Sequence, residues 1–172
     1  MLTTVQLDEI SIRNTLQPGD LGYIIYLHGI LYKQEFGYGI AFEVYVAKGL
    51  HEFITNYSPG KDAIWICEHK GQIVGFLLLV DRGNRSAQLR YFILAPAYRG
   101  IGLGKKLMND FLQHLKSKNF NHAYLWTTHE QEAAAGLYKK TGFTLSEEKS
   151  STTFGKPLRE QRYDLHLGGK DQ

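Results

Sequence analysis

The sequence contains few of the residues and patterns that support disulfides, metal sites or membrane insertion. Cys67 is the only cysteine among 172 residues, which excludes an internal disulfide, and the apolar run Ile64 to Cys67 favours a buried structural thiol. The seven histidines form no His-x-x-x-His spacing, and no Cys-x-x-Cys is present, so we expect no catalytic metal. No apolar run reaches about 18 residues, and no basic segment followed by an apolar stretch opens the chain. We therefore expect neither a membrane span nor a signal peptide.

A large excess of charge of one sign is also absent. The formal net charge is +3, and the basic residues are scattered rather than clustered with aromatic residues, so we expect neither a nucleic-acid nor a membrane partner. A hydrophobic content of 43% predicts one domain with a sizeable core over residues 1–167, followed by a flexible tail at 168–172. The single cysteine fits a reducing, cytoplasmic setting. A homodimer is left open.

The most informative stretch joins a strand to a helix through closely spaced glycines. The strand, rich in β-branched and aromatic residues from Leu89, ends at Pro96, which has no N–H to continue a ladder. The helix is predicted by an apolar repeat of Leu103, Leu107, Phe111 and Leu115. The loop between them carries Gly100, Gly102 and Gly104. Glycines let a ligand approach the main chain, and the first N–H groups of a helix attract anions. The loop is therefore predicted to bind a phosphate or pyrophosphate.

The glycine spacing narrows the kinds of phosphate site that this loop can form. Its G-x-G-x-G pattern differs from the G-x-G-x-x-G of dinucleotide-binding folds, and Lys106 stands where a Walker loop needs a serine or threonine. A plain turn between strand and helix is the remaining alternative.

The rest of the chain alternates between strand and helix patterns. Strands are predicted at 9–16, 63–68, 73–80, 87–94 and 123–128, and helices at 21–36, 42–57, from 103 onward and at 130–140. Gly37-Tyr38-Gly39 is interpreted as a mobile hinge between the first two helices. In the last helix, Ala133, Ala134, Leu137 and Tyr138 are expected to share a face, and Gly142 to form the C-terminal cap. This order predicts a mixed α/β sheet with one parallel crossover through the helix that begins at Leu103.

Two stretches resemble the GNAT N-acetyltransferases. The first is Arg99-x-x-Gly-x-Gly, which follows a hydrophobic strand and Pro96 and is similar to the acyl-coenzyme A loop of that superfamily. The second is Leu137-Tyr138 followed by Gly142-Phe143, which is similar to the signature after the fifth strand. The resemblance covers roughly Ile10 to Leu167. It implies a single-domain GNAT fold with a mixed, mostly antiparallel central sheet flanked by about four helices.

The resemblance extends to the acetyltransferase halves of bacterial proteins that fuse a MarR-type regulator to a GNAT domain. The segments that carry it include Leu31 to Tyr38, Leu89 to Ile93, Leu125 to Thr128 and Gly155 to Gln161. No helix-turn-helix pattern precedes Ile10, so we do not expect the DNA-binding function of those fusions.

The resemblance implies acetyl-CoA as co-substrate and assigns residues to it. Main-chain groups of Phe92, Ile93 and Leu94 would pair with the pantetheine arm, with the N–H of Leu94 near the acyl oxygen. The pyrophosphate would be cradled by Arg99, Gly100, Ile101, Gly102, Leu103, Gly104 and Lys105. Gln131 stands where many members carry an asparagine beside the pantetheine arm. Tyr138 would protonate the leaving thiolate, and its structural alternative is a packed core tyrosine.

Four residues are candidates for accepting the proton of the amine. Glu35 and Glu43 lie on the first two predicted helices, where they would bind the amine or activate it through water, or serve only as solvated carboxylates. His129 and Glu130 follow the fifth predicted strand and are further candidates.

The sequence thus predicts an acetyl-CoA-dependent N-acetyltransferase that acetylates the primary amine of a small molecule or peptide by direct transfer. A non-catalytic acyl-CoA sensor would keep the glycine loop but need no Tyr138. A regulatory partner-binding module would need neither.

Overall fold

A computed structural model describes residues 5–168 of the chain. In chain order the elements are a 3-10 turn Leu7–Glu9, β1 (Ser11–Arg13), α1 (Asp20–Phe36), α2 (Ile40–Thr55), β2 (Ala63–His69), β3 (Gln72–Asp81), β4 (Ser86–Leu94), a 3-10 turn Pro96–Tyr98, α3 (Leu103–Ser117), β5 (His122–Thr128), α4 (Glu132–Lys140), β6 (Thr144–Ser151) and β7 (Leu158–His166). Apart from Gly168, the predicted tail lies outside the described residues.

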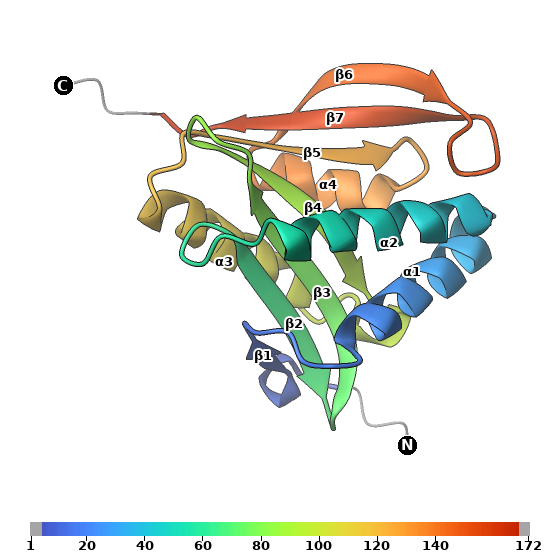
Figure 1. Ribbon diagram of the computed structural model, residues 1–172, viewed down its shortest axis with the longest axis horizontal. Helices are drawn as coiled ribbons and strands as arrows, with labels where there is room; N and C mark the ends of the chain where they lie inside the picture. The colour runs from blue at the N-terminus through green and yellow to red at the C-terminus, as the bar shows by residue number, and fades with distance from the viewer. Residues whose placement is uncertain (1–4, 169–172) are drawn as a thin grey trace.

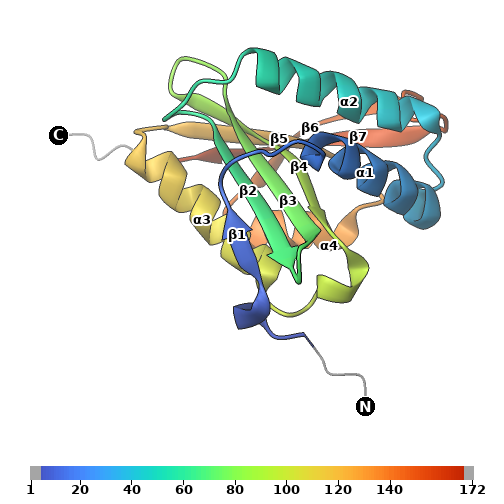
Figure 2. The same cartoon turned by 60° about the horizontal axis from the view of Figure 1, so that its bottom comes forward.

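The strands form one sheet, in the order β1-β2-β3-β4-β5-β7-β6. Helices α1 and α2 cover one face and α3 and α4 the other, as Figures 1 and 2 show. Among the strands of residues 5–168, only β4 and β5 run parallel, and α3 connects them; the other neighbouring strands are antiparallel. The predicted crossover and the mixed, mostly antiparallel sheet are therefore confirmed.

The sheet opens between β4 and β5. Their pairing extends only from Ser86 to Gln88 on β4, and beyond it the two strands diverge. Tyr91 adds to this divergence, because it has a φ of 56° and lies where the β3–β4 register shifts by one residue. The edge of β4 that faces β5 thus has no strand partner after Gln88, among the residues described.

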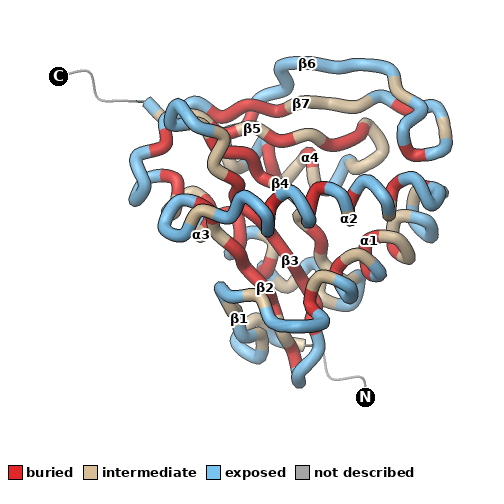
Figure 3. Tube along the Cα trace, in the orientation of Figure 1, coloured by how far each residue is buried: buried red, intermediate tan, exposed pale blue. Residues whose placement is uncertain are grey.

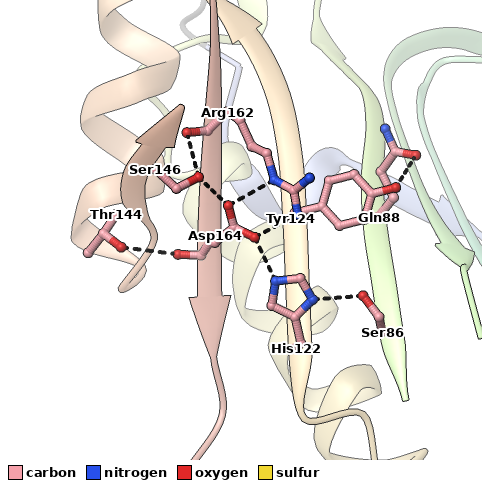
Figure 4. Close-up of polar contacts among 8 residues, drawn as sticks. All are labelled: Ser86, Gln88, His122, Tyr124, Thr144, Ser146, Arg162 and Asp164. Carbon is pink, nitrogen blue, oxygen red and sulfur yellow. Dashed lines mark hydrogen bonds and ion pairs between the residues drawn. The ribbon is translucent and has the colours of Figure 1, made fainter. Parts of the chain in front are cut away.

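A polar cluster ties the strands together at the closed end of this opening (Figure 4). His122 on β5 contacts Ser86 Oγ on β4 through Nδ1 at 2.7 Å and Asp164 Oδ1 on β7 through Nε2 at 2.6 Å. Arg162 and Ser146 also donate to the Asp164 carboxylate. Burial alone would raise the pKa of Asp164, but the hydrogen bonds from Arg162, Ser146 and His122 outweigh it and lower this pKa. The cluster therefore holds a charged carboxylate between four strands.

Each face of the sheet has its own apolar cluster. The α3 side chains Leu103, Leu107, Phe111 and Leu115 are buried, which confirms the predicted stripe. Cys67 is fully buried on β2, and burial raises its pKa to about 12, in agreement with a structural thiol. Figure 3 shows the buried positions concentrated where the helices meet the central strands.

Three sequence predictions about local structure need correction. The first strand is only three residues long, because the Asn14 side chain donates to Ile64 O at 2.7 Å where a ladder bond would continue. In α4 the expected shared face holds for Ala133, Ala134 and Leu137, which line one cleft, but not for Tyr138, which is buried with Ala135. The segment predicted as a mobile hinge is anchored: Tyr38 is buried and its hydroxyl lies 2.7 Å from Thr128 Oγ1.

No helix within residues 5–168 has the length and apolar character needed to cross a bilayer.

Candidate functional site

A cleft of about 680 Å³ lies where β4 and β5 diverge. Its walls are the end of β4, the glycine loop, the start of α3, the start of α4 and the last turns of α1. Of the residues predicted to bind a cofactor, it contains Phe92, Ile93, Leu94, Arg99, Gly100, Gly102, Gly104, Lys105 and Gln131. The side chains of Ile101 and Leu103 do not line it, because both pack into the core beneath the loop.

The glycine loop has the geometry of an anion site. Gly100 and Gly102 adopt φ values of 79° and 91°, a region that side-chain-bearing residues rarely enter. Gly102 caps α3 without a side-chain hydrogen bond, so the first N–H groups of this helix lack intrahelical partners. A Cβ on Gly104 would lie 3.3 Å from Leu137 and 3.6 Å from Phe92, at the narrow floor of the cleft. The loop therefore offers unpaired N–H groups and room for a bulky anion.

Arg99 reaches across the mouth of this cleft. Its guanidinium makes a bidentate ion pair with Glu35 on α1, at 2.7 and 3.0 Å, and its Nε donates to Leu94 O at 3.0 Å. Both side chains remain partly exposed. The predicted phosphate ligand and one predicted catalytic carboxylate are thus paired with each other.

A second cavity of about 260 Å³ opens on the α1–α2 side of the same divergence. Its walls are largely aromatic, from Tyr32, Phe42, Tyr45, Tyr91, Trp126 and Phe154. Tyr32, Phe92 and Gln131 line both this cavity and the cleft. The Tyr32 hydroxyl donates to Gln131 Oε1 at 3.2 Å. This hydrogen bond therefore lies where the cleft and the second cavity meet.

Tyr138 lines the second cavity from α4. Its side chain is 5% exposed, and its ring packs against Phe92, Phe143 and Tyr163. Within residues 5–168 its hydroxyl makes no hydrogen bond to another side chain or to the backbone. Burial raises the pKa of this phenol, so it stays protonated throughout the neutral range. Tyr138 therefore holds a free proton donor beside the junction.

His28 also lines the second cavity, although the sequence indicated it only as one of the helically spaced positions of the first helix. Nδ1 lies 2.8 Å from Ile24 O, so it must carry the hydrogen, and the Nε2 lone pair is buried without a partner in the described part of the chain. Burial lowers the pKa of His28 to about 4, which keeps the imidazole neutral. A polar side chain within the stripe of Ile24, Leu27 and Leu31 was the available signal.

The other sequence candidates lie away from the second cavity. Glu43 does not line either space: its carboxylate packs against Gly29, where a Cβ would lie 2.3 Å from Oε1. His129 Nδ1 accepts a hydrogen bond from the Arg159 backbone N–H at 3.1 Å. Glu130 lines the cleft and binds Lys156 Nζ at 2.5 Å. The carboxylate that does line the second cavity is Glu160, which the sequence did not indicate.

No group of three or more histidine, cysteine or acidic side chains that could hold a metal ion occurs between residues 5 and 168.

Comparison with known proteins gives consistent results. The family model described as Acetyltransferase (GNAT) family matches residues 30–143. The uncharacterized N-acetyltransferase YjgM of Escherichia coli K12 is 32% identical over 97 residues, which cover 55% of this chain and 58% of that protein. The 5-NmdU N-acetyltransferase of Pseudomonas phage PaMx11 is 29% identical over 97 residues, covering 56% of this chain and 67% of that protein. The matched part of the chain thus spans just under three fifths of the YjgM sequence.

Solved structures share the whole architecture. A GNAT-family acetyltransferase from Staphylococcus aureus Mu50 superposes with a TM-score of 0.72 at 22% identity, covering 92% of this chain and 99% of that one. A GNAT-family acetyltransferase from Elizabethkingia anophelis, with acetyl-CoA bound, gives 0.65 at 14% identity, covering 93% and 99%. These likenesses extend over the described sheet and helices.

Proposed function

The chain belongs to the acetyltransferase (GNAT) family, and from this we propose that it is an N-acetyltransferase that transfers the acetyl group of acetyl-CoA directly to the primary amine of a small molecule or peptide. One observation carries the proposal: a cleft lined by the glycine loop and an aromatic cavity meet between the diverging strands β4 and β5. Such a junction lets a donor and an acceptor enter from opposite sides and touch.

The cleft fits acetyl-CoA, which supplies an activated thioester. In our proposal the N–H groups of the glycine loop and of the first turn of α3, including Ile101, Leu103 and Lys105, hold the pyrophosphate. Arg99 adds positive charge. The free edge of β4 at Phe92, Ile93 and Leu94 pairs with the amides of the pantetheine arm as another strand would. Gln131, at the junction, faces the end of that arm.

The acceptor occupies the aromatic cavity. Transfer to an amine releases one proton from the amine and requires one on the leaving thiolate. Tyr138 is placed to donate the second proton, because its hydroxyl is protonated, lines this cavity and has no partner in residues 5–168. For the first proton, Glu35 remains a candidate only if its ion pair with Arg99 opens, and Glu43 would act only from outside the cavity.

The decisive experiment measures free-thiol release from acetyl-CoA by the purified chain over a panel of primary amines, with mass spectrometry of the products. We expect release equimolar with an N-acetylated amine for at least one acceptor class. Tight acetyl-CoA binding without turnover on any amine would instead identify a sensor, and absence of binding would identify a partner-binding module.

A further inference from the structure

Arg90 is a mostly buried cation that lines the acceptor cavity. It lies on β4, its side chain is 13% exposed, and its guanidinium carbon stands 4.7 Å from the ring centroid of Tyr91 and 5.6 Å from that of Tyr45. Helix α2 covers it at Gly49, where a Cβ would lie 1.6 Å from the Tyr91 hydroxyl and 2.7 Å from Arg90 Nη2. A glycine at this position therefore makes room for both the Tyr91 hydroxyl and the Arg90 guanidinium.

The charge of Arg90 is poorly compensated by the protein. The guanidinium makes no hydrogen bond within residues 5–168, and the carboxylate within ion-pair distance in that range, Glu52, lies 3.8 Å away. Glu52 is 49% exposed and is held more closely by Arg82, at 2.9 Å. A buried guanidinium with unused N–H groups is costly unless something pairs with it. Arg90 lines the second cavity, so a molecule bound there is within reach of these N–H groups.

The other charges of the cavity do not balance Arg90. Lys149 Nζ lies 3.4 Å from the Glu160 carboxylate and 4.5 Å from the Trp126 ring centroid, so these two opposite charges pair with each other. His28 is neutral and presents a buried lone pair. The cavity thus carries a surplus positive charge, which would repel a polyamine and attract an acid.

We infer that the acceptor is a small amine that also carries a carboxylate, and that Arg90 binds this carboxylate through its paired N–H groups. This inference rests on the proposed function. A guanidinium matches a carboxylate bidentately, and aromatic walls at about 260 Å³ suit a molecule the size of an amino acid. Arg90 is then a specificity residue, which selects the acceptor without taking part in proton transfer.

Matched acceptor sets test the inference. Each free amino acid is compared with its amide, which keeps the size and side chain but removes the negative charge, and with its decarboxylated amine, which removes the whole carboxyl group. We expect kcat/KM for the best acids to exceed that for their amides by about 10- to 100-fold, the range of a charge-assisted hydrogen bond. The affinity for acetyl-CoA, measured by calorimetry, should be the same in the presence of the acid, the amide or the amine.

Variants then assign the preference to Arg90. Arg90→Gln should lower kcat/KM for acids to that for amides, mainly through KM, and Arg90→Lys should restore part of the difference. Arg85→Gln is the control, because Arg85 lies in the turn before β4, donates to Asn119 O and does not line the cavity; its acid preference should stay that of the parent. Melting temperature and acetyl-CoA affinity report whether each variant is folded.

The outcomes separate the two proposals. Efficient acetylation of amides or simple amines with no advantage for acids would overturn the inference and leave the N-acetyltransferase function intact. An acid preference that persists in folded Arg90→Gln would also overturn it. Lack of acetylation of every amine would contradict the proposed function itself.

Discussion

The Tyr138 hydroxyl is the clearest candidate for a proton donor, and removing it gives a direct prediction. Tyr138→Phe keeps the ring packed against Phe92 and Phe143, so melting temperature and acetyl-CoA affinity should change little. Turnover should fall by about 100-fold or somewhat less, because general acid assistance has that lower bound and a thiolate is a fair leaving group. Single-turnover kinetics measure the chemical step.

Tyr163→Phe is the control, because Tyr163 is equally buried and touches Tyr138 but lines neither space. Because burial raises the pKa of Tyr138, the parent should show no loss of turnover from its ionisation below pH of about 10. A Tyr138→Phe rate within about twofold of the parent, with chemistry rate-limiting, would leave Tyr138 a packing residue and water the donor.

A substitution at Gly104 tests whether the glycine loop binds the pyrophosphate. Gly104→Val places methyl groups toward Leu137, Leu94 and Phe92 at the floor of the cleft. We expect acetyl-CoA affinity in calorimetry to fall by well over tenfold, or about 1.4 kcal/mol. Gly22→Val is matched, because Gly22 also lies in a first helical turn but has open space around it. Equal affinities in the two variants would place the pyrophosphate elsewhere.

Helix α1 reaches the cleft through Glu35, which competes with any anion for Arg99. Glu35→Gln should therefore strengthen acetyl-CoA binding several-fold, by less than about 1 kcal/mol because the pair is partly exposed. Turnover should stay within a few-fold of the parent. The measurement is calorimetric affinity together with steady-state kinetics at low and high salt.

Glu43→Gln provides the comparison, since Glu43 lies on the neighbouring helix and lines neither space. It should alter neither affinity nor turnover. If instead Glu35→Gln abolished turnover and left acetyl-CoA affinity unchanged, Glu35 would be the base. The same loss in Glu43→Gln would assign that role to Glu43.

The cluster around Asp164 joins β4, β5, β6 and β7 at the closed end of the sheet. Asp164→Asn should lower the free energy of unfolding at neutral pH by about 2 kcal/mol, since several donors lose a charged acceptor. The folded-state pKa of Asp164 is depressed, so its contribution is fully present above the unfolded-chain pKa of about 3.9 and is lost as the pH falls below it.

Urea unfolding across this pH range measures the difference, which should shrink as the pH drops below about 4. Asp110→Asn is the control, because Asp110 forms an exposed i,i+4 pair with Lys106 and should change stability by less than about 0.5 kcal/mol. A constant difference between parent and Asp164→Asn at all pH values would show that the carboxylate charge is not what stabilises the cluster.

The molecule as a whole should be stabilised by acetyl-CoA, because the proposed site spans β4, α3, α4 and α1. At a concentration of about 100 times its dissociation constant, acetyl-CoA should add about 2.7 kcal/mol to the free energy of unfolding. For a chain of this length the melting temperature should rise by about 5 to 10 °C, as calorimetry can measure. Inorganic pyrophosphate should raise the melting temperature by a smaller amount. In Gly104→Val, most of the shift caused by either ligand should be lost.

Much of this architecture follows from short-range pattern. The α3 stripe, the Lys70-Gly71 hairpin, the crossover to β5 and the glycine loop are each encoded by residues a few positions apart. Such neighbours determine the backbone conformation directly, because the spacing of apolar side chains favours helix or strand and because glycines accept a positive φ. The local pattern predicted a phosphate-binding loop, whereas the individual cofactor residues around it were assigned from the resemblance to the GNAT acetyltransferases.

Only the tertiary structure decided which distant groups face one another. Arg99 pairs with Glu35, 64 positions earlier in the chain, and Glu43 turns to Gly29 instead of the second cavity. The bulge at Tyr91 and the unpartnered Nε2 of His28 likewise arise from how helices pack on the diverging strands. Side-chain direction within a helix depends on its rotation about its own axis. That rotation is set by the packing of the whole core rather than by local sequence.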